Sequence, residues 1–201
     1  MIHLQLATRN AHKTREFRLL LGAGFALEDL GAHPEIGEIA ENGATFAENA
    51  RIKAITVSRR VSGLVLADDS GLEVDSLGGR PGVFSARYAG EKASDAQNRR
   101  KLLATLAEPR LVRTARFRCV LVLARSGESI ASFAGAVEGT IVRTERGEDG
   151  FGYDALFQPN GFEQTFAELS PAEKNALSHR GMAVAQLREF FAKAGRLPGL
   201  R

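Results

Sequence analysis

The amino-acid sequence predicts an α/β fold that contains at least one antiparallel pair of strands. Three observations carry this prediction. Residues 45–61 repeat apolar side chains at helical spacing behind a capping box that begins at Thr45. Residues 117–123 alternate apolar and other side chains, as a strand does. A tight connection at residues 126–128 then leads to a second strand over residues 129–142, which predicts a hairpin.

The first half of the chain is expected to begin with a strand over residues 2–7 and a helix over residues 11–21, since apolar side chains recur on one face of that helix. A second strand is expected over residues 25–30. The short apolar run 64–67 is typical of a buried strand. The Asp68-Asp69-Ser70-Gly71 string follows, and extended structure is expected to resume over residues 72–75. Successive side chains on a strand point to opposite faces, so Asp68 and Asp69 can serve one site only if the chain bends here, which Ser70-Gly71 permits.

Glycine and proline mark the loops of the second half. Residues 77–90 contain Pro81 and several glycines, and long shaped loops of this kind are often functional. A helix is expected over residues 93–106, and a second glycine-rich loop over residues 147–152. One long helix over residues 171–193, with Pro171 in its first turn, and a loose tail over residues 196–201 are expected to end the chain.

Composition excludes several classes of protein. The 201 residues are 44% hydrophobic and 25% charged, which is typical of a globular protein. The longest apolar run, Cys119–Ala124, is too short to span a membrane, and the first residues do not resemble a secretory signal. The single cysteine allows no internal disulfide, which indicates a reducing, cytoplasmic setting. The net charge of +3 suits an anionic ligand, and no stable nucleic-acid partner is expected.

Residues Thr8–Lys13 lie between the first strand and the first helix, where backbone N–H groups and the helix dipole favour anions. Thr8 and Asn10 add hydrogen bonds and Lys13 adds a positive charge, so this segment predicts a phosphate cradle. The glycines of a P-loop are missing before Lys13. The alternative interpretation is an ordinary helix cap beside a surface lysine.

Asp68 and Asp69 follow a buried strand, at the end where α/β proteins usually bind ligands. Paired carboxylates beside a phosphate site suggest Mg²⁺, and a carboxylate can also orient or deprotonate water. The alternative is a turn rich in Asp and Gly. Cys119, on an alternating strand, is expected to be an inert core thiol.

Two later clusters suggest recognition of a base. The aromatic side chains of Gly150–Asp154 could stack on a base, and Asp154 could accept from a ring N–H group; the alternative is a strand entry with core aromatics. On one continuous last helix, Lys174 and Ser178 share a face, so that Lys174 and the His179-Arg180 pair can border one cleft. Polar residues at the start of a surface helix are the alternative.

The chain resembles the Ham1 family of inosine triphosphate pyrophosphatases in five strings, which follow one another in the order typical of that family and span residues 7–180. The strings are ATRNAHKTREF, TFAENARIKA, ADDSGLEVDSLGGRPGVFSARYAG, GFGYDALFQP and ELSPAEKNALSHR. The resemblance implies an elongated mixed-sheet α/β fold, two lobes around a nucleotide cleft, with one domain over residues 1–201 and a homodimer. It also implies Mg²⁺-dependent hydrolysis of ITP, dITP and XTP to the monophosphate and pyrophosphate, which keeps these nucleotides out of DNA and RNA.

The resemblance further implies roles for individual residues. Glu41 and Asp69 would bind Mg²⁺, and Asp69 would also be the catalytic proton acceptor, although a bound metal lowers the basicity of a carboxylate, so that Asp68 is a second candidate. Arg180 would donate to the oxygen at purine position 6, where adenosine carries a donor. The full set of substrate-binding residues is Thr8, Arg9, Asn10, Ala11, His12, Lys13, Lys53, Ser70, Phe151, Gly152, Tyr153, Asp154, Lys174, His179 and Arg180.

Two positions depart from the family pattern. Arg9 stands where Gly or another small residue is usual, and it could either narrow the cradle or point outward as an extra phosphate donor. Ala155 stands where Pro is usual, which loosens the turn beneath the base. Two alternative functions stay open: a Maf-type pyrophosphatase for pyrimidine or modified nucleotides, and a non-catalytic module that binds nucleotides or nucleic acid.

Overall fold

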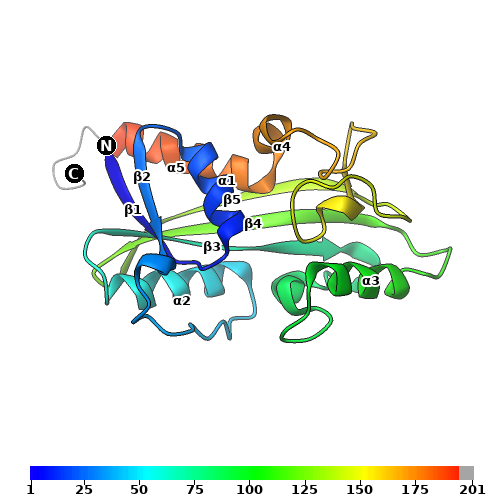
Figure 1. Cartoon of the computed structure of the whole chain (residues 1–201), viewed down its shortest axis with the longest axis horizontal. Coiled ribbons are helices and arrows are strands. Elements are labelled where there is room, and N and C mark those ends of the chain that lie inside the picture. The colour runs from blue at the N-terminus through cyan, green and yellow to red at the C-terminus, as the bar shows by residue number, and fades with distance from the viewer. Residues whose placement is uncertain (195–201) are drawn as a thin grey trace. The chain divides into compact units, whose positions relative to one another are not determined.

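The computed structural model describes residues 1–194 and confirms the α/β class. Six strands form one mixed sheet in the order β2-β1-β3-β4-β5-β6 (Figure 1). The strands are β1 (Ile2–Leu6), β2 (Phe25–Asp29), β3 (Leu64–Val74), β4 (Thr114–Arg125), β5 (Glu128–Ile141) and β6 (Phe157–Pro159). The helices are α1 (Ala11–Leu21), α2 (Phe46–Ser58), α3 (Asp95–Thr105), α4 (Pro171–Leu177) and α5 (His179–Ala194). Strand β1 pairs in parallel with β2 and β3, whereas β5 and β6 are antiparallel.

The chain divides into two compact units. Unit 1 comprises Met1–Asp69, Cys119–Gly135 and the residues from Arg180 onward, and unit 2 comprises Ser70–Arg118 and Ala136–His179. Strands β3, β4 and β5 contribute residues to both units. The expected tail over residues 196–201 lies outside the described residues. Within residues 1–194, no helix combines the length and the apolar character that a bilayer crossing requires.

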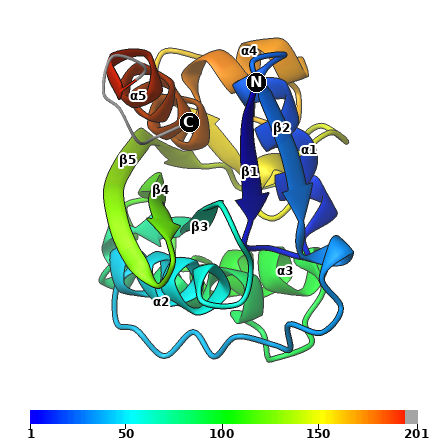
Figure 2. The ribbon, with the colours of Figure 1, turned by 90° about the vertical axis from the view of Figure 1, so that its left-hand side faces the viewer.

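In unit 1, strand β3 sends successive side chains into two different cores. Leu64 and Leu66 pack against α1 and α5, where Phe17 and Leu187 are buried. Val65 and Ala67 pack against α2 in a core formed mainly by small side chains: Ala50, Ala54 and Val57. Helix α2 therefore covers one face of the sheet, and α1 and α5 cover the other (Figure 2). The same alternation applies to Asp68 and Asp69, the next residues of β3, because successive side chains along a strand point to opposite faces.

Unit 2 has a core of its own, which is built around aromatic rings. Leu72 and Val74 of β3 pack there with Leu102 of α3. The ring of Phe117 lies 4.7 Å from the ring of Phe157, measured between centroids, and such tilted pairs contribute beyond the area that they bury. Tyr153 is part of this core, which therefore supports the segment Phe151–Asp154.

Several expected elements are confirmed. Helix α1 has the predicted bounds, and Thr45 caps α2 in a complete capping box with Glu48. The tight turn is present, with Ser126 and Gly127 both in the left-handed region at φ values of 53° and 82°. The loop predicted over residues 77–90 contains a short 3₁₀ helix at Gly82–Arg87.

The sequence permits a bend at Asp68-Asp69-Ser70-Gly71, but the structure has none there. Strand β3 runs without interruption from Leu64 to Val74. The local preference of Asp and Gly for turns is overridden because the strand is central in the sheet and each aspartate meets cationic partners on its own face.

The single helix expected over residues 171–193 was also wrong, because the chain breaks at Ser178. Its backbone is extended, with φ −72° and ψ 155°, while its N–H group still donates to the carbonyl of Lys174 at 2.9 Å. Serine suits such a junction, since its side chain competes for the backbone groups that a helix leaves unpaired at its ends. Lys174 and Ser178 therefore do not share one face of a continuous helix, contrary to the prediction. Pro171 does occupy the first turn of α4, as predicted.

Candidate active site

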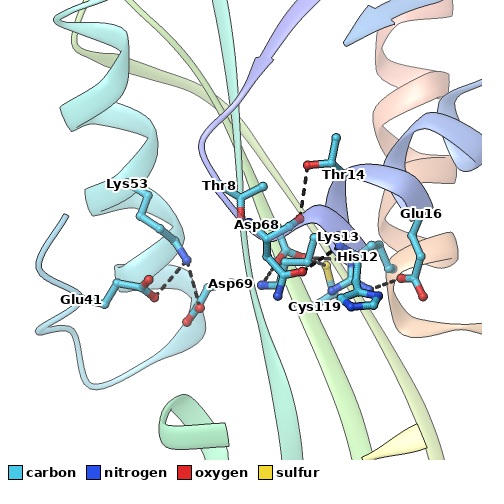
Figure 3. Close-up of polar contacts among 12 residues, drawn as sticks. Thr8, His12, Lys13, Thr14, Glu16, Glu41, Lys53, Asp68, Asp69 and Cys119 are labelled. Atoms are coloured by element: carbon cyan, nitrogen blue, oxygen red, sulfur yellow. Dashed lines mark hydrogen bonds and ion pairs between the residues drawn. The ribbon is translucent and has the colours of Figure 1, made fainter. Parts of the chain in front are cut away.

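Asp68 lies on the face of β3 that is covered by α1 and α5, and it is almost fully buried. The ammonium of Lys13 forms an ion pair with Oδ1, while Arg180 Nε and Cys119 Sγ each donate to Oδ2 at 3.2 Å (Figure 3). Burial opposes ionisation of this carboxyl, but Lys13 and Arg180 outweigh it and hold the pKa of Asp68 far below its usual range. Asp68 is therefore a permanent negative charge that anchors Lys13.

Arg180 lies in the first turn of α5 and is only 2% exposed. Its guanidinium is bound by Asp68 on one side and by Glu16 of α1 on another. Burial lowers the pKa of Arg180, but these two carboxylates more than compensate and raise it above its usual value. The structure thus places Arg180 in the same buried network as Lys13. Its predicted contact with a purine base stays a prediction.

The predicted phosphate cradle contains a helix cap. Asn10 precedes α1, and its Oδ1 accepts from the backbone N–H groups of His12 at 2.9 Å and Lys13 at 3.2 Å. Thr8 Oγ1 in turn accepts from the backbone N–H group of Asn10 at 3.1 Å. Two amides of the first turn are thus already bonded, and the ammonium of Lys13 is a positive group that this segment directs at Asp68. Ala11 and His12 lie exposed at the start of the helix.

Arg9, which departs from the family pattern, binds a different segment of the chain. Its Nη2 donates to the backbone carbonyls of His33, at 3.3 Å, and Ile36. The side chain of Ile36 is fully buried, so this segment is anchored to the core. Because the chain continues from Ile36 to Glu41, Arg9 connects the Thr8–Lys13 segment to the loop that carries this carboxylate.

Asp69 lies on the opposite face of β3, toward α2. Lys53 Nζ lies 3.2 Å from Asp69 Oδ1 and 2.9 Å from Glu41 Oε2, and the lysine is buried (Figure 3). Burial raises the pKa of Asp69 to about 6, because Lys53 and Lys13 only partly oppose it. Burial also lowers the pKa of Lys53, but Asp69 and Glu41 reverse this effect and raise it above its usual value. The two faces of β3 thus carry one aspartate held ionised and one that titrates close to neutral pH.

Glu41 and Asp69 fit a divalent cation. Asp69 Oδ2 is buried and has no hydrogen-bond partner within residues 1–194. The two carboxylates already converge on one positive charge, the ammonium of Lys53. No group of three His, Cys, Asp or Glu side chains suited to a metal occurs in the described part of the chain. Two carboxylates suffice for Mg²⁺, which completes its coordination with substrate phosphates and water.

In unit 2, Asp154 organises the second candidate cluster. Its Oδ2 accepts from the backbone N–H group of Phe151 at 2.9 Å and from Lys174 Nζ at 2.7 Å. The same ammonium lies 5.2 Å from the centre of the Phe151 ring. Gly150 is required here, because a Cβ atom at that position would lie 2.2 Å from Asp154 Oδ2. The result is a half-buried aromatic ring beside a fixed positive charge.

Tyr153 and His179 are buried among other side chains of unit 2. The hydroxyl of Tyr153 donates to the carbonyl of Ser85 at 2.9 Å, and burial raises the pKa of this phenol well above its usual value. The ring of His179 stacks on Phe117, with 4.8 Å between the ring centres. Ser70, next to Asp69 along β3, is half-buried.

Sequence reasoning identified most members of these clusters but missed two. Glu16 lies three positions after Lys13 on α1, so helical spacing would have placed the two side chains on one face. The contact between Cys119 and Asp68 joins two strands far apart in the sequence, and no local pattern indicates it. Cys119 is a buried thiol, as predicted, and burial followed by the charge of Asp68 raises its pKa well above the usual value.

The chain is similar to known proteins over most of its length. The model of the Ham1 family matches residues 4–190. The chain is 49% identical over 191 residues to a protein of Streptococcus thermophilus named dITP/XTP pyrophosphatase, covering 94% of this chain and 59% of that protein. It thus spans about three fifths of the length of that relative. A protein of Geobacillus kaustophilus with the same name is also 49% identical, with 94% of both chains covered. The solved structure of a HAM1 protein from Coxiella burnetii superposes with a TM-score of 0.86 at 40% identity, covering 96% of this chain and all of that one.

The Asp69→Asn variant is expected to be more stable than the unmodified chain at pH 8. The folded pKa of about 6 exceeds the ordinary value of 3.8, so the folded state binds the extra proton and stability falls as pH rises from about 4 to 6. A shift of this size corresponds to about 3 kcal/mol at most. Thermal unfolding at pH 8 and at pH 4 measures it, with a gain at pH 8 that shrinks at pH 4. A loss of stability at pH 8 would contradict the assigned burial of this charge.

The Arg9→Ala variant is expected to loosen the segment from residue 33 to Glu41, because its side chain bonds two carbonyls there. Amide hydrogen exchange in residues 33–41 should accelerate, whereas exchange in α2 should not change. Arg15→Ala, a change at an exposed arginine of α1, is the matched control. Equal exchange in both variants would show that Arg9 does not hold this loop.

Proposed function

Because the chain belongs to the Ham1 family, we propose that it hydrolyses the non-standard purine nucleoside triphosphates ITP, dITP and XTP to the monophosphate and pyrophosphate. The observation that carries this proposal is the pair of buried lysine–carboxylate clusters on the two faces of β3. The names of the relatives favour this activity over a Maf-type specificity or a non-catalytic binding module.

The proposed triphosphate ligands are Lys13 and Lys53. Hydrolysis of a phosphoanhydride depends mainly on positioning and on neutralising charge. Each lysine is already oriented by an aspartate, Lys13 by Asp68 and Lys53 by Asp69. In the proposed complex the phosphate oxygens share these two ammonium groups. We also assign Thr8, Arg9, Asn10, Ala11, His12 and Ser70 to substrate binding.

Glu41 and Asp69 are the proposed ligands of Mg²⁺. The bound cation would neutralise phosphate charge and polarise a phosphoryl oxygen. The donor set supports this assignment, since Asp69 Oδ2 has no partner in the described part of the chain and both carboxylates already face one positive charge. Lys53 would then exchange part of its contact with these carboxylates for phosphate oxygens.

The structure favours Asp69 over Asp68 as the proton acceptor. Asp68 is held ionised by Lys13 and Arg180, which makes it a weak base, and both of its oxygens are bonded. Without metal, Asp69 has a pKa of about 6, so it is the stronger base of the two, and bound Mg²⁺ would lower this pKa. In the proposed step, water attacks the α-phosphorus while the carboxylate of Asp69 takes its proton. The bond between the α-phosphorus and the bridging oxygen breaks, and pyrophosphate leaves.

For base recognition we assign Phe151, Gly152, Tyr153, Asp154, Lys174, His179 and Arg180. Phe151 offers a ring for stacking, and Lys174 fixes Asp154 beside it. Arg180 would donate to the oxygen at purine position 6, and its two carboxylate partners orient the guanidinium. A site built on such hydrogen bonds discriminates strongly against a base that presents a donor there.

The remaining features of the proposal extend the family resemblance. We propose that residues 1–201 act as a single domain, that the chain forms a homodimer, and that it works in the cytoplasm. The lone cysteine suits a reducing compartment.

The test is release of pyrophosphate from ITP, XTP and dITP compared with ATP, GTP and dTTP, each with Mg²⁺ and with a chelator. The expected result is pyrophosphate, not phosphate, from the first three substrates and only with metal. Asp69→Asn should lower turnover by roughly 10²-fold or more, the range for loss of a general base. The exposed Glu128→Gln variant is the control and should retain activity. Phosphate as the product, or full activity of Asp69→Asn, would overturn the assignment.

A further inference from the structure

Helix α3 holds the peptide groups of one glycine from both sides. The backbone N–H group of Gly152 donates to Asp95 Oδ2 at 2.7 Å, and Arg99 Nη1 donates to the carbonyl of Gly152 at 2.9 Å. Asp95 and Arg99 are four residues apart on α3, so their side chains lie on the same face of that helix. The two side chains therefore satisfy both polar groups of this residue.

The loop that they hold has no regular structure of its own. Gly147, Gly150 and Gly152 all adopt positive φ, at 82°, 81° and 62°. Arg99 also forms an ion pair with Glu145 before this loop, at 2.9 Å. Since glycine gives the unfolded loop many alternative conformations, contacts from side chains are needed to select one. Arg99 and Asp95 contact the segment before the loop and the glycine at its end.

Phe151 directly precedes the glycine that α3 holds. Its own N–H group is held by Asp154, and the peptide that follows it is held by α3. The backbone that carries the ring is thereby held on both sides, and Lys174 lies 5.2 Å from the centre of the ring. A base that stacks on this ring depends on its position, because binding geometry has to hold within about 0.5 Å.

The folding of α3 does not require these two bonds. The helix begins with a complete capping box between Ser94 and Gln97, and Asn98 and Leu102 are its buried side chains. Asp95 is exposed, and the side chain of Arg99 is 19% exposed. Both residues direct charge-assisted hydrogen bonds at the loop instead of packing into the core of unit 2.

We propose that Asp95 and Arg99 are positioning residues that fix the Phe151–Asp154 segment for recognition of the purine base. This inference rests on the proposed function, which assigns that segment to the base. Neither residue touches the phosphates in this assignment, so both act on binding and selectivity and not on the chemical step.

Asp95→Ala and Arg99→Met test this assignment. The KM for ITP is expected to rise roughly tenfold, which corresponds to about 1.4 kcal/mol, while kcat changes less than about twofold. The preference for ITP over ATP should fall by a similar factor. Asp95→Asn retains an acceptor oxygen for the Gly152 N–H group and should restore the KM. Arg100→Met, at the exposed neighbouring arginine of α3, is the matched control.

Amide hydrogen exchange provides a readout that does not depend on activity. Exchange in residues 147–153 should accelerate in Asp95→Ala and Arg99→Met but not in Asp95→Asn or Arg100→Met. Unchanged exchange with an unchanged KM would overturn the inference and leave the proposed function intact. A fall in kcat at constant KM would overturn it as well. If the unmodified chain hydrolyses none of the triphosphates, the proposed function fails, and the assignment to base recognition fails with it even where exchange accelerates.

Discussion

Two adjacent aspartates on one uninterrupted strand determine how the candidate site is arranged. Because β3 does not bend, Asp68 and Asp69 point to opposite faces of the sheet, where Lys13 and Lys53 meet them. The alternation that buries Leu66 and Val65 in separate cores upstream thus continues as two separate charged clusters. The alternation of side chains along β3 therefore determines both which core each apolar side chain enters and which lysine each aspartate meets.

The two clusters differ in electrostatics for a physical reason. Asp68 is surrounded by Lys13, Arg180 and a thiol donor, so its charge is compensated and permanent. Asp69 shares Lys53 with Glu41, and Lys53 and Lys13 only partly compensate its burial. An incompletely compensated buried charge of this kind lowers the free energy of unfolding. Binding of a proton or of a cation would remove this cost. Proteins commonly retain such destabilising charges where they are needed for function.

Local patterns in the sequence predicted much of this molecule. The capping box at Thr45, the hairpin turn at Ser126-Gly127 and the bounds of α1 all follow from interactions within a few residues. The course of β3 through Asp68 and the break at Ser178 were missed, because tertiary contacts and the junction of two helices decide them. Most candidate residues were predicted through the family resemblance. The contacts that organise them, such as that of Glu16 with Arg180 and those of α3 with Gly152, join distant segments and required the structure.

The central proposal is that Asp68 stays charged whereas Asp69 exchanges a proton for the proposed Mg²⁺. Carbon NMR of the two labelled carboxyl groups, titrated with and without Mg²⁺, measures this most directly. The account predicts that Asp69 titrates at about pH 6 without metal and at a distinctly lower pH with it, while Asp68 shows no transition above about pH 4. A transition near pH 6 at Asp68, or a titration of Asp69 that Mg²⁺ does not shift, would contradict the account.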